Sequence, residues 1–390
     1  MTKGGCGLPK ADLAAEGAPM QAVILIGQAP MTIWGMSGAE RLRRSFERAG
    51  LARTEAAGPT LPKLSSVILI RADWVFDQRL IVALMRAPDT VLLAEDGTPV
   101  ATHVCGADAE QARRMIEAGE TQAPEGMRVC SPLELAGGFD NKLRKREVPF
   151  LMPLKAETLP QIRDRTFQGS YKGVTDFVTK HVWPRPAQMV TGWCANLGIT
   201  PNHVTWLSLA LVLVAFWLFW IGAYGAGLVA AWVMTFLDTV DGKLARVTMN
   251  FSKAGDALDH GIDLVHPPFW WWAWIAGLPA SGHPLSHAGL ALAIIVAGYV
   301  AQRIEEGIFL WWFRIEMHIW RPFDSWFRGV TARRNPNLVI LTLASLAGRP
   351  DWGIAAVAAW TVICFFVHLL QIVQALLARR RGPITSWLAA

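Results

Sequence analysis

The sequence is organised around the stretch from Asp238 to Asp263, which reads DTVDGKLARVTMNFSKAGDALDHGID. Its regularly spaced aspartates lie within two segments that are otherwise apolar. At helical spacing, each half of the stretch places its small and charged residues on one face: Asp238, Asp241, Gly242, Ala245 and Arg246, then Gly255, Asp259 and Asp263. Two helices joined by a polar turn at 248–253 therefore bring the four carboxylates together and leave an open side for a ligand.

Ionised aspartates beside hydrocarbon are costly, so they indicate a functional cavity with a compensating cation. Carboxylate oxygens are hard ligands, and the expected cation is therefore Mg²⁺ or Mn²⁺. A transporter or channel whose carboxylates bind permeating cations is the alternative. The glycines, the alanine and the arginine at fixed offsets favour an enzyme, because cation passage does not require them.

The spacing D-x2-D-G-x2-A-R-x8-G-x3-D-x3-D matches the signature of the CDP-alcohol phosphotransferase family at every fixed position. The stretch from about Tyr171 to Arg381 resembles the membrane domain of that family. The resemblance implies transfer of a substituted phosphate from a CDP-linked donor to an acceptor hydroxyl, with release of CMP, by a homodimer that uses two divalent ions. It makes Asp238, Asp241 and Asp259 metal ligands, and Asp263 both a ligand and the catalytic base that takes the hydroxyl proton.

The same resemblance assigns the CDP moiety to residues around the motif. These are Gly242, Arg246 and Ser252, and Gly255 lets the helices or the nucleotide approach closely. The segment ITPNHVT, residues 199–205, resembles the family segment that opens the first spanning helix and lines the CDP site. That likeness adds Pro201 and Asn202, for which a helix cap is the alternative role.

Acceptor binding is expected from arginines further along the chain. Gln302, Arg303, Glu305 and Glu306 lie at one end of an apolar segment and either line the substrate cavity or form an internal ion-pair cluster. Arg333 and Arg334 either bind a substrate phosphate or anchor the chain at the membrane surface. The charged residues Asp256 and His260 occupy variable motif positions and receive no role.

Composition divides the 390 residues into two halves of different character. Residues 1–140 are mixed and charged and are predicted to form an α/β domain; residues 141–170 are a linker and residues 171–390 the membrane domain. The charge run NKLRKRE at 141–147 is interpreted as solvated linker, with substrate binding as the alternative. The net charge of +6 and the 19 tryptophans suit a membrane protein, and the absence of a continuous basic stripe argues against nucleic acid as a partner.

The second half predicts six transmembrane helices preceded by a juxtamembrane amphipathic helix. The spans are expected at about 203–222, 225–247, 255–279, 285–313, 335–348 and 352–378. The amphipathic helix at 171–198 is broken at Pro184 and Pro186 and carries one apolar face, formed by Met189, Val190, Trp193 and Leu197. Basic residues concentrate on one side of the spans, so both termini and the aspartates are expected to face the cytoplasm from the cytoplasmic (inner) membrane. Residues 1–17 have no apolar core and are not read as a signal peptide.

The first half alternates short apolar runs with helical patterns. Strands are predicted at 22–26, 67–70 and 90–94 and helices at 37–49, 79–86 and 109–118, which together indicate a small Rossmann-like domain with a largely parallel sheet. The run AVILIGQAP and the segments after it resemble sugar-phosphate nucleotidylyltransferases, with Asp73 at the position of a metal-binding aspartate in that family. Gly27 is followed by Gln28, Ala29 and Pro30 where that family has glycines and an arginine, so the domain is predicted to be degenerate.

The sequence leaves the direction of transfer open. One reading is phosphatidyl transfer from CDP-diacylglycerol to a soluble polyol or polyol phosphate, as in phospholipid synthesis. The other is transfer from a soluble CDP-alcohol, such as CDP-inositol or CDP-glycerol, to a lipid hydroxyl. Membrane lipids are partners in both.

Overall fold

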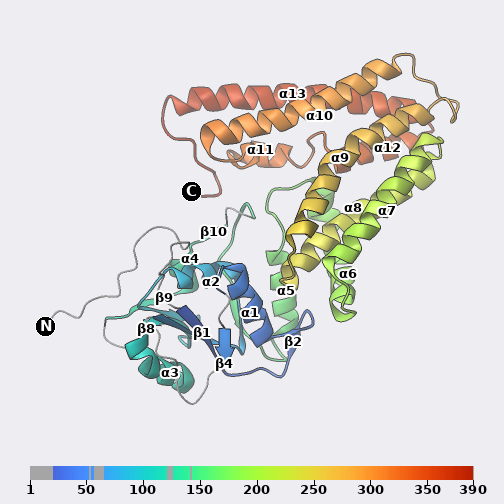
Figure 1. The fold of residues 1–390 in the computed structure, drawn as a ribbon. Coiled ribbons are helices and arrows are strands. Elements are labelled where there is room, and N and C mark those ends of the chain that lie inside the picture. Colours follow the sequence, from blue (N-terminus) through green and yellow to red (C-terminus); the bar gives the residue numbers. More distant parts are fainter. Residues whose placement is uncertain (1–20, 52–53, 57–65, 121–125, 141–142, 390) are drawn as a thin grey trace. The chain divides into compact units, whose positions relative to one another are not determined.

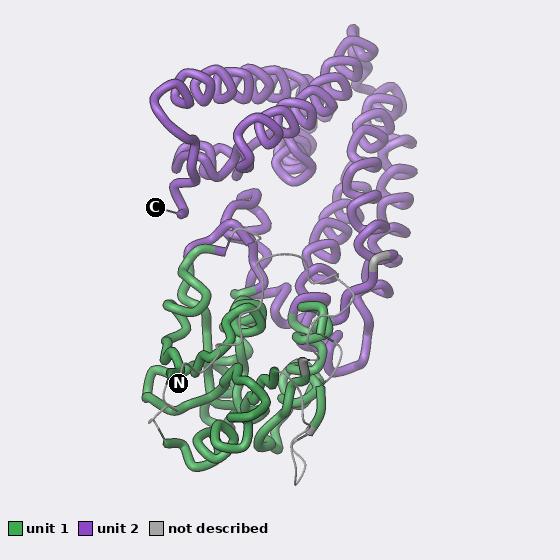
Figure 2. The backbone as a smooth tube through the Cα atoms, turned by 60° about the vertical axis from the view of Figure 1, so that its left-hand side comes forward, with its two compact units in different colours: residues 1–139, 147–169, 247–249 green, residues 140–146, 170–246, 250–390 purple. Residues whose placement is uncertain are grey.

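The computed structural model describes residues 21–51, 54–56, 66–120, 126–140 and 143–389. The N-terminal residues 1–17 and the first two residues of the charge run at 141–147 therefore lie outside the described part. The chain divides into two compact units, shown in Figure 2. Unit 1 comprises residues 1–139, 147–169 and 247–249, and unit 2 comprises residues 140–146, 170–246 and 250–390.

Unit 1 is built on a six-stranded sheet with the strand order β4-β1-β5-β8-β7-β9. The strands are β1 (Gln21–Ile26), β4 (Thr54–Ala56), β5 (Ser66–Arg71), β7 (Thr90–Leu93), β8 (Pro99–Cys105) and β9 (Arg128–Cys130). Strand β1 runs parallel to β4 and β5, and β7 runs parallel to β9. Strand β8 is antiparallel to both of its neighbours, so the sheet is mixed rather than largely parallel.

The turn between β7 and β8 explains the antiparallel strand. Asp96 and Gly97 form a tight hairpin in which Gly97 has a φ of +83°, the Asp96 carboxylate accepts from Thr98 N–H, and Ala94 N–H donates to Thr98 O. An Asp-Gly pair between apolar runs is a strong hairpin signal, because glycine adopts a positive φ at no steric cost. The sequence prediction ended at the first strand of this hairpin and missed the second.

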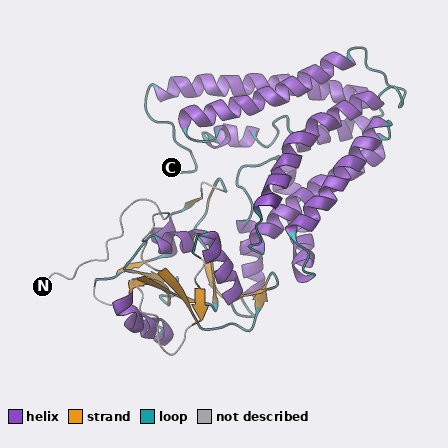
Figure 3. Ribbon diagram, viewed as in Figure 1, coloured by secondary structure: helices purple, strands orange, loops and turns teal. Residues whose placement is uncertain are grey.

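Helices cover both faces of the sheet, as Figures 1 and 3 show. The helices α1 (Gly38–Arg48) and α2 (Gln78–Met85) share a core with one face of the strands, and α3 (Ala109–Ala118) shares a core with the other face. Neighbouring residues of β1 alternate between the two cores: Val23 belongs to the first and Ile24 to the second. The α/β character predicted for this half of the chain is confirmed.

Short elements complete unit 1. They are β2 (Thr32–Ile33), β3 (Met36–Ser37), β6 (Trp74–Phe76), β12 (Leu151–Pro153), the 3₁₀ turn η1 (Gly106–Asp108), α4 (Pro132–Ala136) and α5 (Leu159–Gly169). Strand β12 pairs with β6, and the Trp34 indole donates to Thr166 Oγ1 on α5 at 2.8 Å. Much of the segment expected to be a linker is therefore folded into unit 1, since its apolar residues bury against the unit. The small strands β10 (Phe139–Asp140) and β11 (Lys145–Arg146) follow α4 in the chain.

Unit 2 contains a helix at each of the six predicted spans. These are α7 (Pro201–Trp220), α8 (Tyr224–Val247), α9 (Lys253–Gly277), α10 (Ala288–Phe313), α12 (Arg334–Leu346) and α13 (Pro350–Arg379). Three of them, α7, α10 and α13, are long and apolar enough to cross a membrane. Helix α12 has only 13 residues, about 20 Å at 1.5 Å per residue, against a hydrocarbon core of about 30 Å. The polar motif lowers the hydropathy of α8 and α9.

The remaining elements of unit 2 are short. They are the π-helical turn η2 (Val178–Val182), α6 (Pro184–Asn196), the 3₁₀ turn η3 (Met317–Ile319) and α11 (Pro322–Phe327). Helix α6 occupies the segment predicted to be amphipathic and begins at Pro184, where proline is tolerated because the first helical N–H has no acceptor. The predicted apolar residues Met189, Trp193 and Leu197 are exposed, with relative accessibilities of 59, 60 and 75%.

An aromatic core holds α7 against α9. The side chains of Phe219, Trp270 and Trp274 are fully buried and pack against one another with ring centroids 5.0 to 5.9 Å apart. The two indoles donate hydrogen bonds to backbone carbonyls, Trp270 to Val212 O and Trp274 to Pro350 O. Buried aromatic rings contribute large apolar areas, and satisfied indole N–H groups avoid the cost of an unpaired donor. This core fixes the helix that carries Asp259 and Asp263.

Candidate active site

Three of the four motif aspartates converge between α8 and α9. One carboxylate oxygen of Asp238, of Asp259 and of Asp263 lies within 4.8 Å of those of the other two. Asp259 and Asp263 are one turn apart on α9, and Asp238 faces them from α8. Three oxygen ligands at this separation suit a divalent cation such as Mg²⁺. We call Asp238, Asp259 and Asp263 the aspartate cage.

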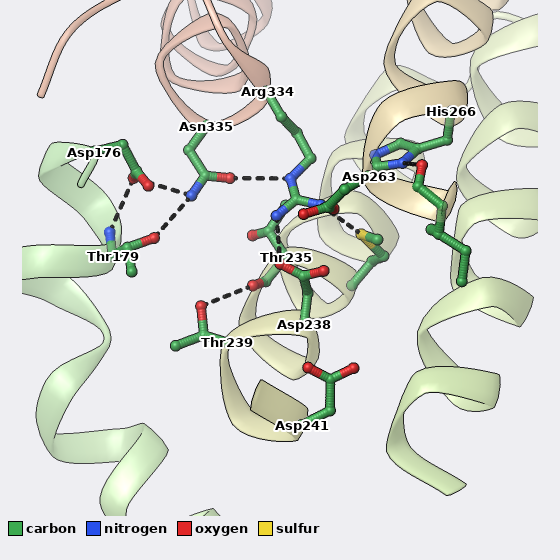
Figure 4. A network of polar contacts seen from close by, with 12 residues as sticks. Asp176, Thr179, Thr235, Asp238, Thr239, Asp241, Asp263, His266, Arg334 and Asn335 are labelled. Carbon is green, nitrogen blue, oxygen red and sulfur yellow. Dashed lines mark hydrogen bonds and ion pairs between the residues drawn. The ribbon is translucent and has the colours of Figure 1, made fainter. Parts of the chain in front are cut away.

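The fourth aspartate, Asp241, is oriented differently. Its side chain is nearly completely buried, and Oδ2 accepts a hydrogen bond from Thr205 Oγ1 on α7 at 2.7 Å. Its other oxygen, Oδ1, has no hydrogen-bond partner among the described residues and is therefore a free ligand atom beside the cage. The sequence placed all four carboxylates together; in the structure three form the cage and Thr205 holds the fourth. Figure 4 shows Asp238, Asp241 and Asp263 of this group.

Arg334, at the start of α12, bridges the aspartate cage. Its Nη1 donates to Asp263 Oδ1 at 2.5 Å and its Nη2 donates to Asp238 Oδ2 at 2.6 Å (Figure 4). A guanidinium with parallel donors neutralises two carboxylates at once. The sequence predicts Arg334 as a substrate-phosphate ligand or a membrane anchor; in the structure it pairs with two aspartates of the cage.

A buried polar network positions Arg334. The Asn335 amide accepts from Arg334 Nε at 3.4 Å and donates to Asp176 Oδ1 at 3.0 Å and to Thr179 Oγ1 at 3.2 Å (Figure 4). Burial alone would raise the pKa of Asp176, but hydrogen bonds from Thr179 and Asn335 hold that pKa below its ordinary value. The Asp176 carboxylate is therefore ionised at neutral pH and keeps Asn335 oriented.

Three of the residues assigned to the CDP moiety meet where α7 and α9 begin. The Asn202 side chain lies 3.4 Å from Ser252 Oγ, and Ser252 caps α9 by accepting from Gly255 N–H at 2.9 Å. A Cβ on Gly255 would lie 2.4 Å from Asn202 Oδ1 and 2.6 Å from Ser252 Oγ, so only glycine fits without a shift. The helix-cap role foreseen as an alternative at the start of α7 belongs to Thr200, whose hydroxyl accepts from His203 N–H.

The aspartate cage opens into a cavity of about 540 Å³. Gly242 and Arg246 line it beside the cage. Its cationic lining exceeds its anionic lining, eight residues to six: Arg144, Lys172, Lys243, Arg246, Arg303, Arg328, Arg333 and Arg334 against Asp176, Asp238, Asp259, Asp263, Glu306 and Glu316. Such a lining suits a ligand that carries several negative charges.

Sequence reasoning missed part of this lining. Arg144 was assigned to a solvated linker, and the structure places it in the cavity wall, paired with Glu316. Lys243 stands at a variable motif position, yet its ammonium is buried 3.2 Å above the Tyr171 ring and donates to Ser170 O. Local sequence spacing does not predict the position of either residue, because the partners of each lie far away in the sequence.

Arg328 is the clearest unsatisfied cation of the cavity. Its Nε and Nη1 are buried and have no hydrogen-bond partner in the described part of the chain. Burial, followed by the charge of Arg333, lowers the pKa of Arg328 to about 9, so the guanidinium is still charged at pH 7. A buried, charged and unpaired donor indicates a position where an anion binds.

The arginines proposed for the acceptor separate into two places. Arg333 pairs with Glu306, and Arg303 lies 3.5 Å from the same carboxylate and over the ring of Tyr299. Arg334 lies instead on the aspartate cage. The sequence allows two alternatives for the segment around Arg303: an internal ion-pair cluster, or residues that line the substrate cavity. Glu306 forms ion pairs as in the first alternative, and Arg303 also lines the cavity as in the second.

In unit 1, the residues of the second resemblance form a different arrangement. Asp73 pairs with Arg71, with Nη2 and Oδ2 2.6 Å apart, and lies beside Gly27. The carboxylate at the position of a metal ligand therefore already has a cation of its own. A degenerate nucleotidylyltransferase remains a prediction for this unit.

Comparison with known proteins addresses unit 2. Residues 198–327 match the family model described as CDP-alcohol phosphatidyltransferase. Over 80 residues the chain is 40% identical to an archaetidylinositol phosphate synthase of Pyrococcus horikoshii, a match that covers 20% of this chain and 42% of that protein. The chain thus spans less than half the length of this curated relative.

Proposed function

Because residues 198–327 form a CDP-alcohol phosphatidyltransferase domain, we propose that the protein is a membrane enzyme of phospholipid synthesis. It transfers a phosphatidyl-type group from a CDP-linked lipid, most simply CDP-diacylglycerol, to the hydroxyl of a soluble polyol phosphate and releases CMP. The convergence of the aspartate cage with a strongly basic cavity carries this proposal.

The cage residues fit a divalent metal by their chemistry, since each contributes a carboxylate oxygen and Asp241 has a free buried oxygen beside them. When bound, Mg²⁺ or Mn²⁺ would neutralise the diphosphate and the leaving phosphate, and the family pattern suggests two ions. Asp238, Asp241 and Asp259 hold the metal, and Asp263, the most exposed cage member at 47%, also faces the acceptor.

The chain's own groups then align the reaction. The acceptor oxygen bonds to the lipid-bearing phosphorus, the bond from that phosphorus to the CMP oxygen breaks, and the hydroxyl proton passes to Asp263. Asp263 orients the hydroxyl through a hydrogen bond before it takes the proton. Phosphoryl transfer depends mainly on positioning and charge neutralisation, so the fixed cage is the principal catalytic element.

The nucleotide is held at the start of α7 and α9 in this proposal. Asn202, Ser252 and Gly255 form a close-packed corner, and Gly242 and Arg246 line the cavity. Gly255 lets Asn202 and Ser252 approach α9 closely, and Gly242 lets the Arg246 guanidinium lie against α8. The Arg246 guanidinium supplies charge for a phosphate oxygen.

A phosphorylated acceptor is favoured over a neutral polyol. Arg328 offers buried, unpaired donors, and Arg144, Lys172, Arg303 and Arg333 line the same cavity. The metal-loaded cage would bind one anionic group, the diphosphate of the donor. The arginines and the lysine elsewhere in the lining therefore suit a second phosphate, carried by the acceptor. The Pyrococcus relative is named for a product that contains inositol phosphate, which agrees with this choice.

The membrane arrangement is part of the proposal. We infer six spans in the cytoplasmic membrane: the three clearly apolar helices α7, α10 and α13, together with α8, α9 and the short α12. Both termini and the cage are inferred to face the cytoplasm. The exposed apolar residues of α6 suit the membrane surface. A homodimer is expected from the family resemblance.

CMP release by purified protein with Mg²⁺ tests the proposal. CDP-diacylglycerol or CDP-inositol is supplied as donor, with inositol, inositol phosphate, glycerol phosphate or lipid hydroxyls as acceptors. Activity only with a soluble CDP-alcohol and a lipid acceptor would reverse donor and acceptor. Ion flux in proteoliposomes without CMP release would support the transporter alternative.

Asp259→Asn and Asp256→Asn make a matched pair for this assay. Both aspartates lie on α9, but only Asp259 belongs to the cage, and Asp256 is exposed. The proposal requires loss of Mg²⁺-dependent CMP release in the first variant and wild-type release in the second.

A further inference from the structure

A second group of metal-type ligands lies beside the acceptor side of the cavity. It consists of Glu306 on α10, His318 on η3 and His368 on α13, and one ligand atom of each lies within 4.8 Å of those of the other two. A fourth candidate, Glu305, places Oε2 3.5 Å from His368 Nδ1. We call these four residues the histidine cluster.

The histidine cluster contains buried polar atoms without partners. His368 is completely buried, and neither of its ring nitrogens has a hydrogen-bond partner among the described residues. The same holds for His318 Nδ1 and for both carboxylate oxygens of Glu305. A buried polar group without a hydrogen-bond partner destabilises the fold, so several of them in one place require an explanation.

The surroundings of the histidine cluster supply no such partners. Phe327 packs edge-on against the His368 ring, and the rings of His318 and His368 lie only 5.6 Å apart between centroids. His318 Nε2 lies 3.2 Å from Glu306 Oε1, and His368 Nδ1 lies 3.5 Å from Glu305 Oε2, so both rings present a nitrogen to a carboxylate. Imidazole nitrogens combined with carboxylates are the ligands of Zn²⁺ and related transition metals, whereas Mg²⁺ prefers oxygen alone.

We propose that Glu306, His318 and His368 bind one transition-metal ion of the zinc class, with Glu305 as a fourth or outer ligand. Ligand atoms about 2.1 Å from a tetrahedral ion lie about 3.4 Å from one another, so the ion would draw these side chains slightly together. This site is distinct from the aspartate cage in residues and in ligand chemistry. It does not rest on the proposed function.

The position of the histidine cluster indicates a structural role. Glu306 and His368 come from long helices, whereas His318 comes from the segment that joins α10 to α12 and carries Arg328 and Arg333. A bound ion would tie this segment to both helices and so fix two cations of the cavity wall. The competing arrangement is an ion-pair cluster without metal, in which Arg333, Arg303 and His318 satisfy Glu306.

Metal analysis of the full-length protein distinguishes the two arrangements. Protein purified in detergent is stripped with a chelator, saturated with Mg²⁺ to fill the aspartate cage, and titrated with Zn²⁺ or Co²⁺. The proposal predicts about one tightly bound equivalent per chain, a higher melting temperature and, for Co²⁺, the intense visible bands of a four-coordinate site. Absence of stoichiometric binding by the wild-type protein would overturn it.

Variants identify the ligands. His368→Ala and the more conservative His368→Gln should lower bound Zn²⁺ at least tenfold and abolish the Zn²⁺-dependent thermal shift. His283→Ala is the matched control, because His283 lies in the loop before α10 and its imidazole contacts Ser281 O, away from the histidine cluster. Unchanged Zn²⁺ binding in a folded His368→Gln protein would refute the assignment.

Discussion

Gly255 gives the sharpest test of the active-site assignment, because a single added methyl group has a defined effect there. In Gly255→Ala the new Cβ would stand 2.4 Å from Asn202 Oδ1 and 2.6 Å from Ser252 Oγ. Real Cβ atoms essentially never approach a heavy atom closer than 3.0 Å. Either the Asn202 side chain or the first turn of α9 must therefore move by several tenths of an ångström.

A shift of this size in the proposed nucleotide corner should reduce kcat/KM about 10- to 100-fold, since misplacements of about 1 Å cost around 100-fold in positioned reactions. The fold should tolerate the change because both colliding atoms lie at the ends of side chains and not in the backbone. The assay is CMP release at varied CDP-diacylglycerol, together with thermal unfolding in the same detergent.

Gly261→Ala is the matched control on the same helix. A Cβ there meets nothing within 4 Å, so the substitution should leave activity unchanged and stabilise the helix by about 0.5 to 1 kcal/mol. Equal activity of the two alanine variants would refute the role of Gly255 and, with it, the placement of the nucleotide at the Asn202 corner.

Three further perturbations follow from the structure. Arg328→Gln should raise KM for the phosphorylated acceptor about tenfold and leave KM for the donor unchanged. The control Arg185→Gln, on the exposed side of α6, should alter neither KM. Steady-state kinetics with each substrate varied in turn would measure both. Burial lowers the pKa of His103 below its ordinary value of 6.5, so below pH 6.5 the unfolded chain binds a proton that the folded chain does not bind. The free energy of unfolding of unit 1 should therefore fall by up to about 1.4 kcal/mol per pH unit on acidification. Hydrogen exchange of β8, corrected for intrinsic rates, would measure this. A pH-independent stability in wild type, equal to that of His103→Gln, would contradict this. Trp274→Ala should cost about 3 to 5 kcal/mol and lower the melting temperature strongly, whereas Trp272→Ala, at a site 42% exposed, should have a much smaller effect.

Local periodicity was sufficient to predict the aspartate cage. Asp259 and Asp263 are one helical turn apart, and Asp238 precedes the turn that reverses the chain, so helix geometry alone brings them together. The same reasoning placed Asp241 in the cage. Helical spacing could not predict the hydrogen bond from the Thr205 hydroxyl, 36 residues away in the sequence, that orients the Asp241 carboxylate.

The fold was predicted best where the pattern was local as well. The helices α1, α2 and α3 lie within a residue or two of their predicted positions. The antiparallel strand β8 was missed because its residues, PVATHVC, mix apolar and polar types without clear alternation. The only local signal for this strand is the preceding Asp-Gly turn. Local patterns could not predict the histidine cluster, since its members come from three elements and lie up to 63 residues apart in the sequence.

The distribution of charge in the cavity explains how one site could hold two substrates that both carry phosphate. At one end the aspartate cage is acidic, and in this structure Arg334 compensates Asp238 and Asp263. Elsewhere in the lining Arg328 and Arg333 are basic; Arg333 pairs with Glu306, and the charges of Asp176 and Glu306 act on Arg328. A diphosphate can approach the acidic end only with a cation, whereas a phosphate monoester needs none at the basic end. In the proposed reaction this difference in charge would separate the two substrates, with the metal-bound diphosphate at the cage and the acceptor phosphate at Arg328 and Arg333, so that the acceptor hydroxyl points toward Asp263.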